Sequence, residues 1–148
     1  SHAELVNAYD NAVLYTDHVL VEAVAALQAQ ADRLDVALLY VSDHGESLGE
    51  AGLYLHGVPY PIAPATQLQV PMVLWMSRAF ADGSGLEHRC LAGLGSARAS
   101  HDQLFDSVLG VLQVETAVYR PERDLVAVCR PARTAGNAPG YAGPGRAG

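Results

Sequence analysis

The sequence predicts an α/β fold, and three features of the chain support this class. Residues 1–30 carry apolar side chains at the three- and four-residue spacing of an amphipathic helix. Residues 36–41 and 70–76 are short apolar runs rich in branched and aromatic side chains, which is typical of buried strands. A second helical pattern occupies residues 100–112. Helices that alternate with buried strands predict a layered sheet flanked by helices.

The composition fits one soluble, acidic globular domain. A chain of 148 residues can bury a real core, and a hydrophobic fraction of 50% is ordinary. The net charge of −7 and the scattered basic residues argue against a nucleic-acid partner, because phosphate contacts need clustered cations. No apolar run approaches the roughly 20 residues of a membrane span, and no signal-peptide pattern opens the chain.

The first helix has both a capping pattern and an apolar face. Ser1 and Glu4 have the spacing of a capping box. Asp10 and Asp17 are seven residues apart and therefore lie on nearly the same face, where we interpret them as solvated surface carboxylates. The predicted apolar face consists of Leu5, Tyr9, Val13, Thr16, Leu20, Val24 and Leu27.

The strand at residues 36–41 is followed by a long loop and a second strand. Seven glycines and prolines punctuate residues 45–64, and loops of this length in compact domains usually serve a site. Residues 70–76 form the second strand, with Pro71 near its start, where a missing N–H is tolerated.

The second half of the chain is expected to be less regular. Residues 77–98 are glycine-rich and aperiodic, which predicts an exposed loop. Ser100 and Gln103 repeat the capping pattern and open the helix to Leu112, and we interpret His101 as a surface residue. Its expected core face is Leu104, Phe105, Val108 and Leu112.

The end of the chain is predicted to hold two edge strands and a tail. Residues 115–119 and 125–129 are the candidate edge strands, separated by a turn-like polar segment. From residue 131 onward the chain offers almost nothing to bury, so residues 131–148 should be a disordered tail.

The residues with the clearest chemistry follow the first strand. Asp43 and His44 come directly after residues 36–41, and Gly45 then lets the backbone turn. Ligands collect at the carboxyl ends of strands in open α/β sheets, and zinc takes imidazole and carboxylate ligands. The pair therefore predicts a metal site, although spacing alone favours a structural aspartate and a hydrogen-bonded histidine.

His56 is the second histidine of this region, twelve residues after His44. It lies in the long loop, where a histidine can also be simply exposed. Glu46 is a candidate for orienting a ligand imidazole, a frequent partner of metal-bound histidine, or for facing water.

A longer string of residues changes this interpretation. Residues 40–50 (YVSDHGESLGE), residues 52–57 (GLYLHG), Gln67 and residues 70–72 (VPM) closely resemble the bacterial phosphoethanolamine transferases that modify lipid A. That family includes the mobile colistin-resistance enzymes and belongs to the sulfatase branch of the alkaline phosphatase superfamily. The resemblance covers roughly residues 4–130, so residues 1–130 are expected to be the C-terminal portion of such a catalytic domain.

The resemblance implies a reaction and roles for individual residues. Phosphoethanolamine would pass from phosphatidylethanolamine to a lipid A or lipopolysaccharide acceptor through a phosphorylated threonine, with zinc as the metal. Asp43 and His44 resemble two of the zinc ligands. His56 resembles the histidine that helps to hold the phosphoethanolamine group or a second metal. The catalytic domain of the family faces the periplasm at the bacterial inner membrane.

The resemblance also implies that part of the site lies elsewhere. The threonine nucleophile, a glutamate ligand and the membrane helices of the family correspond to positions upstream of Ser1. We therefore expect the chain by itself to be marginally stable and inactive. The family's periplasmic domains carry disulfides, which makes a bond between Cys90 and Cys129 an expectation. Two alternatives stay open: a hydrolase of the same superfamily, and an inert fragment that acts only through interactions.

Overall fold

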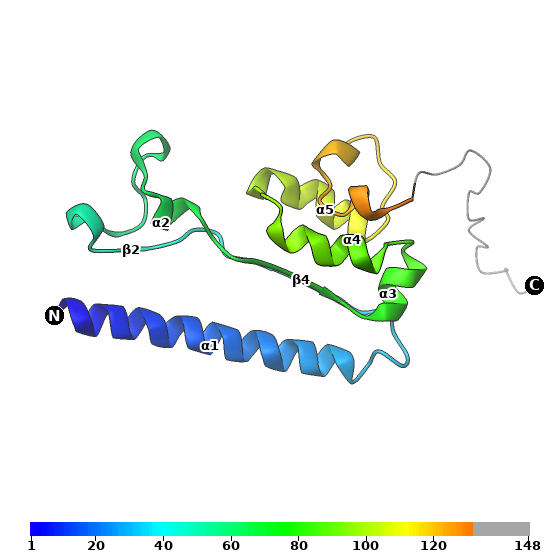
Figure 1. The fold of residues 1–148 in the computed structure, drawn as a ribbon, viewed down its shortest axis with the longest axis horizontal. Helices are drawn as coiled ribbons and strands as arrows, with labels where there is room; N and C mark the ends of the chain where they lie inside the picture. The colour runs from blue at the N-terminus through cyan, green and yellow to red at the C-terminus, as the bar shows by residue number, and fades with distance from the viewer. Residues whose placement is uncertain (132–148) are drawn as a thin grey trace, which may run out of the picture. The chain divides into compact units, whose positions relative to one another are not determined.

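The computed structural model describes residues 1–131 and confirms the α/β class. The chain forms two compact units, Ser1–Phe80 and a second that begins at Ala81. The first unit contains the long helix and the strands, and the second unit is helical (Figure 1). Apart from Pro131, the predicted disordered tail lies outside the described residues.

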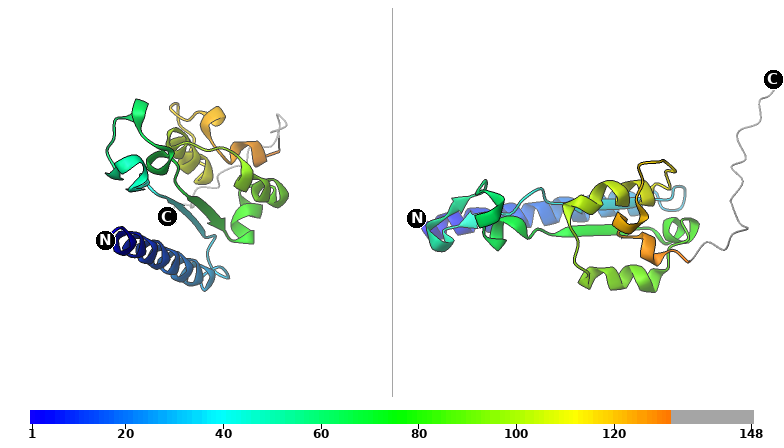
Figure 2. Two further views of the ribbon diagram at one scale, coloured as in Figure 1. Left: turned by 60° about the vertical axis from the view of Figure 1, so that its left-hand side comes forward. Right: turned by 90° about the horizontal axis from the view of Figure 1, so that it is seen from above.

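Helix α1 (His2–Gln28) confirms the first predicted helix. The capping box is present: Glu4 donates its backbone N–H to the Ser1 hydroxyl, and its carboxylate accepts from the Ser1 amino group. The helix lies on one face of the strands of its unit (Figure 2). No residue of α1 is fully buried, and most members of the predicted apolar face are half-buried, while Leu5 and Val13 are exposed.

Both predicted strands are present, and they pair with each other. Strand β1 (Ala37–Val41) and strand β4 (Met72–Met76) run antiparallel, with Leu39 opposite Leu74. Parallel neighbours need a long crossover connection of a dozen or more residues, usually a helix, whereas antiparallel neighbours do not. Antiparallel neighbours place the end of β1 beside the start of β4, which is where the loop between the two strands begins and ends.

The predicted long loop contains a small β-hairpin. Strand β2 (Ser47–Leu48) pairs antiparallel with strand β3 (Tyr54–Leu55). The 3-10 turn η1 (Glu50–Gly52) connects them and needs positive φ at several positions, including Gly49 at 125°. The turn η2 (Tyr60–Ile62) and the short helix α2 (Ala65–Leu68) complete the connection to β4.

The prediction of an exposed loop over residues 77–98 is wrong. Helix α3 (Arg78–Gly83), helix α4 (His88–Gly93) and the turn η3 (Leu94–Ser96) occupy this segment. Two of its residues, Ala81 and Leu86, are among the most buried apolar residues of the described chain. Each helix is only six residues long, which is too short for a periodic pattern to emerge in a sequence window.

The capped helix near residue 100 is confirmed, but its predicted core face is wrong. Ser100 and Gln103 form the capping box of the turn η4 (His101–Gln103), which leads into helix α5 (Leu104–Val111). Phe105 and Leu112 are 59% and 63% exposed. The buried residues are instead polar or small: Asp106, Ser107 and Gly110.

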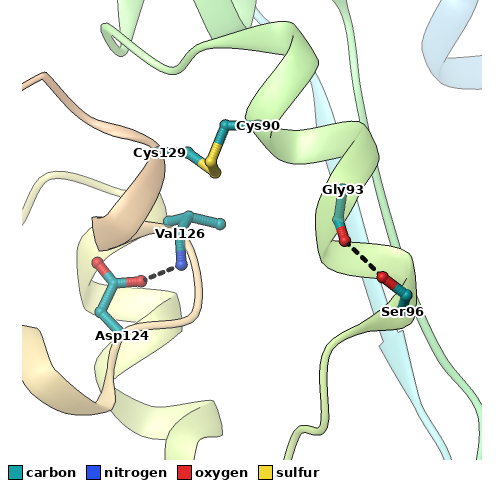
Figure 3. The surroundings of a disulfide bond; sticks show 6 residues. All are labelled: Cys90, Gly93, Ser96, Asp124, Val126 and Cys129. Carbon is teal, nitrogen blue, oxygen red and sulfur yellow. Dashed lines mark hydrogen bonds between the residues drawn. A yellow bond between two sulfur atoms is a disulfide. The ribbon is translucent and has the colours of Figure 1, made fainter.

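The two edge strands predicted after α5 do not form. Residues 115–119 are turn and irregular structure, and residues 125–129 end in the 3-10 turn η6 (Ala127–Cys129). A further turn, η5 (Pro121–Arg123), lies between them. The expected disulfide joins Cys90 of α4 to Cys129, with their Cα atoms 5.3 Å apart (Figure 3). This bond ties the end of the described chain to α4.

A buried carboxylate organises the second unit. The Asp124 side chain is fully buried and accepts hydrogen bonds from the Tyr119 hydroxyl at 2.7 Å and the Val126 amide at 2.9 Å. Arg130 forms an ion pair with it at 3.0 Å and also donates to the Gly110 carbonyl. These contacts compensate the buried charge, and they place Gly110 of α5 against it.

Within residues 1–131, no helix combines the length and apolarity needed to span a bilayer.

Candidate functional site

The candidate site begins where β1 ends. The Ser42 amide donates to the Pro71 carbonyl at 3.3 Å, which extends the β1–β4 pairing by one step. The chain then turns away, and the Gly45 amide donates to the Gln67 carbonyl at 3.0 Å. A Cβ atom on Gly45 would lie 2.0 Å from the Thr66 carbonyl oxygen, so only glycine allows this close approach.

Asp43 and His44 lie on this turn with their side chains close together. The Asp43 carboxylate accepts a hydrogen bond from the His44 amide at 3.1 Å, and its second oxygen lies 3.7 Å from Nε2 of His44. His44 Nδ1 donates to the Gly45 carbonyl at 3.1 Å. Because a carbonyl can only accept, Nδ1 carries the proton, and Nε2 of the neutral ring keeps its lone pair. The turn therefore presents a carboxylate and an unprotonated imidazole nitrogen side by side.

The β2–β3 hairpin brings His56 to the same place. Ser47 pairs with Leu55, so the residues just outside this pair, Glu46 and His56, face each other. His56 Nδ1 donates to Oε1 of Glu46 at 2.6 Å. The carboxylate thus sets the tautomer of His56 in the same way that the Gly45 carbonyl sets that of His44, and Nε2 of His56 also keeps its lone pair.

The two imidazole rings stack on each other, with centroids 3.7 Å apart and an interplanar angle of 30°. His44, Glu46 and His56 each offer a ligand atom, and these atoms all lie within 4.8 Å of one another. Oε2 of Glu46 is buried and has no hydrogen-bond partner in the described chain. Imidazole nitrogens and carboxylate oxygens are zinc donors, and an unpartnered buried carboxylate oxygen is costly without a cation. These residues therefore fit a divalent metal.

A polar network that includes the Gln67 and Ser47 side chains lies next to the site in the sequence and in space. The Gln67 amide nitrogen donates to the Ser47 hydroxyl at 2.9 Å, and its carbonyl oxygen accepts from the Val58 amide at 3.3 Å. The Ser47 hydroxyl also lies 3.3 Å from that of Thr66. Gln67 is only 5% exposed, so its amide makes its hydrogen bonds inside the protein.

Of the three residues selected from the sequence, the structure brings His44 and His56 into one cluster with Glu46, whereas Asp43 lies outside that cluster and approaches only His44, 3.7 Å from its Nε2. Asp43 has the most accessible side chain of the three, at 89% exposure. Of the two options for Glu46, the structure shows the one in which it orients an imidazole. In the sequence, Gln67 counted only as one residue of the family resemblance, and nothing in its neighbourhood assigned it a role.

The comparisons with known proteins show the family of the chain. Residues 1–114 match the profile of the Sulfatase family. Over 131 residues the chain is 43% identical to the phosphoethanolamine transferase EptA of Salmonella typhimurium, and the match covers 88% of this chain. It covers only 24% of that relative, so the chain spans about a quarter of its length.

Two solved structures from Neisseria meningitidis have the same fold. The soluble domain of lipooligosaccharide phosphoethanolamine transferase A superimposes with a TM-score of 0.83 at 44% identity, covering 89% of this chain and 40% of that domain. The integral membrane form of that enzyme gives a TM-score of 0.82 at 45% identity, covering 88% of this chain and 25% of the enzyme. Both support the resemblance drawn from the sequence.

Proposed function

Because the chain belongs to the sulfatase family, we propose that it is part of a zinc-dependent enzyme that transfers phosphoethanolamine from phosphatidylethanolamine to lipid A. The observation that carries the proposal is the meeting of two loops at His44, Glu46 and His56. Glu46 and His56 are ten residues apart in sequence, and a carboxylate–imidazole hydrogen bond holds their loops together.

Each residue has a distinct part in this proposal. Asp43 and His44 are ligands of the zinc ion, the second through Nε2, since its Nδ1 is already bonded to the Gly45 carbonyl. His56 presents its own Nε2 to a phosphate oxygen of the phosphoethanolamine group, because Glu46 holds its Nδ1. A zinc ion bound here would supply a Lewis acid for charge that develops on the phosphoryl oxygens.

We also propose where the site lies in the cell, and that this chain supplies only part of its zinc ligands. The relatives that support it include an integral membrane enzyme, and we place the site at the periplasmic face of the bacterial inner membrane. The 148 residues supply two proposed zinc ligands, whereas structural and catalytic zinc sites use three or four protein groups. The chain by itself is therefore expected to bind zinc weakly and to transfer nothing. Zinc-dependent release of phosphoethanolamine by this polypeptide alone would contradict this expectation.

The decisive experiment measures zinc content and transfer in the full-length enzyme and in its Asp43→Asn variant. The substitution keeps the size of the side chain but removes its charge, so zinc occupancy and transfer from labelled phosphatidylethanolamine to lipid A should both fall. Asp17→Asn, which removes an exposed carboxylate from α1, is the matched control and should change neither. Unchanged zinc occupancy in Asp43→Asn would contradict the assigned ligand.

The same assay separates transfer from hydrolysis. The match to the Sulfatase family also fits an enzyme that gives the phosphoryl group to water. Label that appears on lipid A supports the transferase, whereas label that appears only as free phosphoethanolamine supports the hydrolase.

A further inference from the structure

Gln67 is connected to both loops of the candidate site, although it belongs to neither. It is the buried residue of the four-residue helix α2. Its side-chain nitrogen donates to the hydroxyl of Ser47, the neighbour of Glu46, and its side-chain oxygen accepts from the amide of Val58, two residues beyond His56. Its backbone carbonyl accepts from the amide of Gly45, the neighbour of His44.

The two ends of the amide make this connection directional. The Val58 amide can only donate, so it requires the oxygen end of the Gln67 side chain, and the nitrogen end is left to donate to the Ser47 hydroxyl. Because Gln67 is only 5% exposed, water cannot replace either hydrogen bond at low cost. A single side chain therefore sets the separation between the strand that follows Glu46 and the turn that follows His56.

We propose that Gln67 is a positioning residue that holds Glu46 against His56 and thereby keeps the proton of the His56 ring on Nδ1. The inference rests on the proposed function, because it assigns Gln67 a part in presenting Nε2 of His56 to a phosphate oxygen. The hairpin alone has only two paired residues on each strand, too few to set this separation. The bond from His56 Nδ1 to Glu46, 2.6 Å long, depends on that separation.

The test compares Gln67→Met with Gln69→Met. Methionine has nearly the length of glutamine but neither donates nor accepts as an amide does. Gln69 lies two residues further along, its side chain is exposed, and the same substitution there serves as the matched control. The readout is the ring ¹⁵N spectrum of His56 in the metal-free chain, assigned with a His56→Gln variant. It reports directly which ring nitrogen carries the proton.

The parent protein and Gln69→Met should show His56 with its proton on Nδ1, and Gln67→Met should show a mixture of both tautomers. In the full-length enzyme, Gln67→Met should lower kcat/KM for transfer roughly ten- to a hundredfold, the range for residues that orient a site's side chains. Gln69→Met should stay close to the parent value. An unchanged His56 spectrum in a folded Gln67→Met protein would overturn the inference.

A second variant covers the case in which Gln67→Met does not fold. Ser47→Ala removes the acceptor of the Gln67 nitrogen, together with the contact to the Thr66 hydroxyl, but leaves the Gln67–Val58 hydrogen bond in place. It should shift the His56 tautomers in the same direction by a smaller amount. No shift in Ser47→Ala would overturn the inference in that case. If the tautomer depends on Gln67 but the parent enzyme neither binds zinc nor transfers phosphoethanolamine, the proposed function fails and the positioning of His56 by Gln67 stands.

Discussion

Replacing Gly110 by alanine should destabilise the second unit, although Gly→Ala in a helix normally stabilises. Gly110 lies in α5 and has helical geometry. A Cβ atom there would lie 1.9 Å from Oδ2 of Asp124 and 2.5 Å from its Cγ. Real Cβ atoms do not come this close, so the buried carboxylate or the helix must move. Oδ2 is the oxygen that accepts from Tyr119 and Arg130, so moving it breaks the contacts that compensate the charge.

The magnitude follows from two opposing effects. Alanine gains about 1 kcal/mol over glycine in a helix interior. Separating a buried ion pair costs about 3–5 kcal/mol, because one charge stays buried without its partner. We therefore expect Gly110→Ala to lower the free energy of unfolding by about 2–4 kcal/mol. With a urea m-value of about 2 kcal/mol per molar, the midpoint should fall by about 1–2 M.

The assay is urea unfolding of the oxidised chain, monitored by circular dichroism. Gly93→Ala is the control, because Gly93 ends helix α4, has φ of −73°, and has no atom within 4 Å of an added Cβ. That control should leave stability unchanged or raise it by up to about 1 kcal/mol. The double variant Gly110→Ala with Asp124→Ala should be no less stable than Asp124→Ala alone, because the clashing carboxylate is gone.

Two results would refute this reasoning. The first is a Gly110→Ala protein that is as stable as the Gly93→Ala control, which would mean that Asp124 can move without losing its partners. The second is additivity of the two substitutions in the double variant. Additivity would mean that the cost of the alanine arises somewhere other than its contact with Asp124.

Three further predictions concern the disulfide, the half-buried Tyr119 and the site loop. Cys129→Ser opens a link between residues 39 apart and should lower the free energy of unfolding by about 4 kcal/mol in the chain-entropy model; an unchanged urea midpoint against the oxidised parent would contradict it. Burial, followed by the hydrogen bond to Asp124, raises the pKa of Tyr119 from 10.0 to about 12. The neutral phenol therefore contributes to stability in full below pH 10, and this contribution is lost as the pH rises towards 12. Urea midpoints measured across that range should fall for the parent more steeply than for Tyr119→Phe, and equal slopes would show that another group titrates. Gly45→Ala places a Cβ atom 2.0 Å from the Thr66 carbonyl oxygen and should weaken zinc binding by the full-length enzyme. The control Gly52→Ala has no neighbour for its Cβ atom but a strained φ of 77°, so it should affect the hairpin turn and leave zinc binding unchanged. Equal zinc affinity in the Gly45→Ala and parent proteins would contradict the close approach at Gly45.

The sequence predicted elements well where the signal is local. The periodic apolar residues and the Ser1 cap defined α1, and branched apolar runs defined β1 and β4. The Ser100 cap likewise located the start of the segment that becomes α5. These signals lie within one element, so they can be read without knowing the rest of the fold.

The predictions failed where packing overrides local preference. Residues 115–119 and 125–129 contain valine, threonine and tyrosine, which favour strands. In the structure this segment is organised by the buried carboxylate of Asp124 and by the disulfide of Cys129, and no strand forms there. In α5, the Ser107 hydroxyl accepts from the Leu125 amide and Gly110 lies against the Asp124 carboxylate, so these two residues face inward and Phe105 is exposed.

The candidate site divides in the same way. From the sequence alone, Asp43, His44 and His56 could be selected as residues with metal-site chemistry, and the end of β1 could be named as their position. Only the tertiary structure decided that Glu46 accepts a hydrogen bond from His56 and that the two imidazoles stack. It also decided that Gln67 hydrogen-bonds to the residues next to Glu46 and beyond His56. The reason is physical: side-chain chemistry and helical or strand periodicity are properties of neighbouring residues, whereas these contacts depend on hairpin register and on a close backbone approach between segments about 20 residues apart.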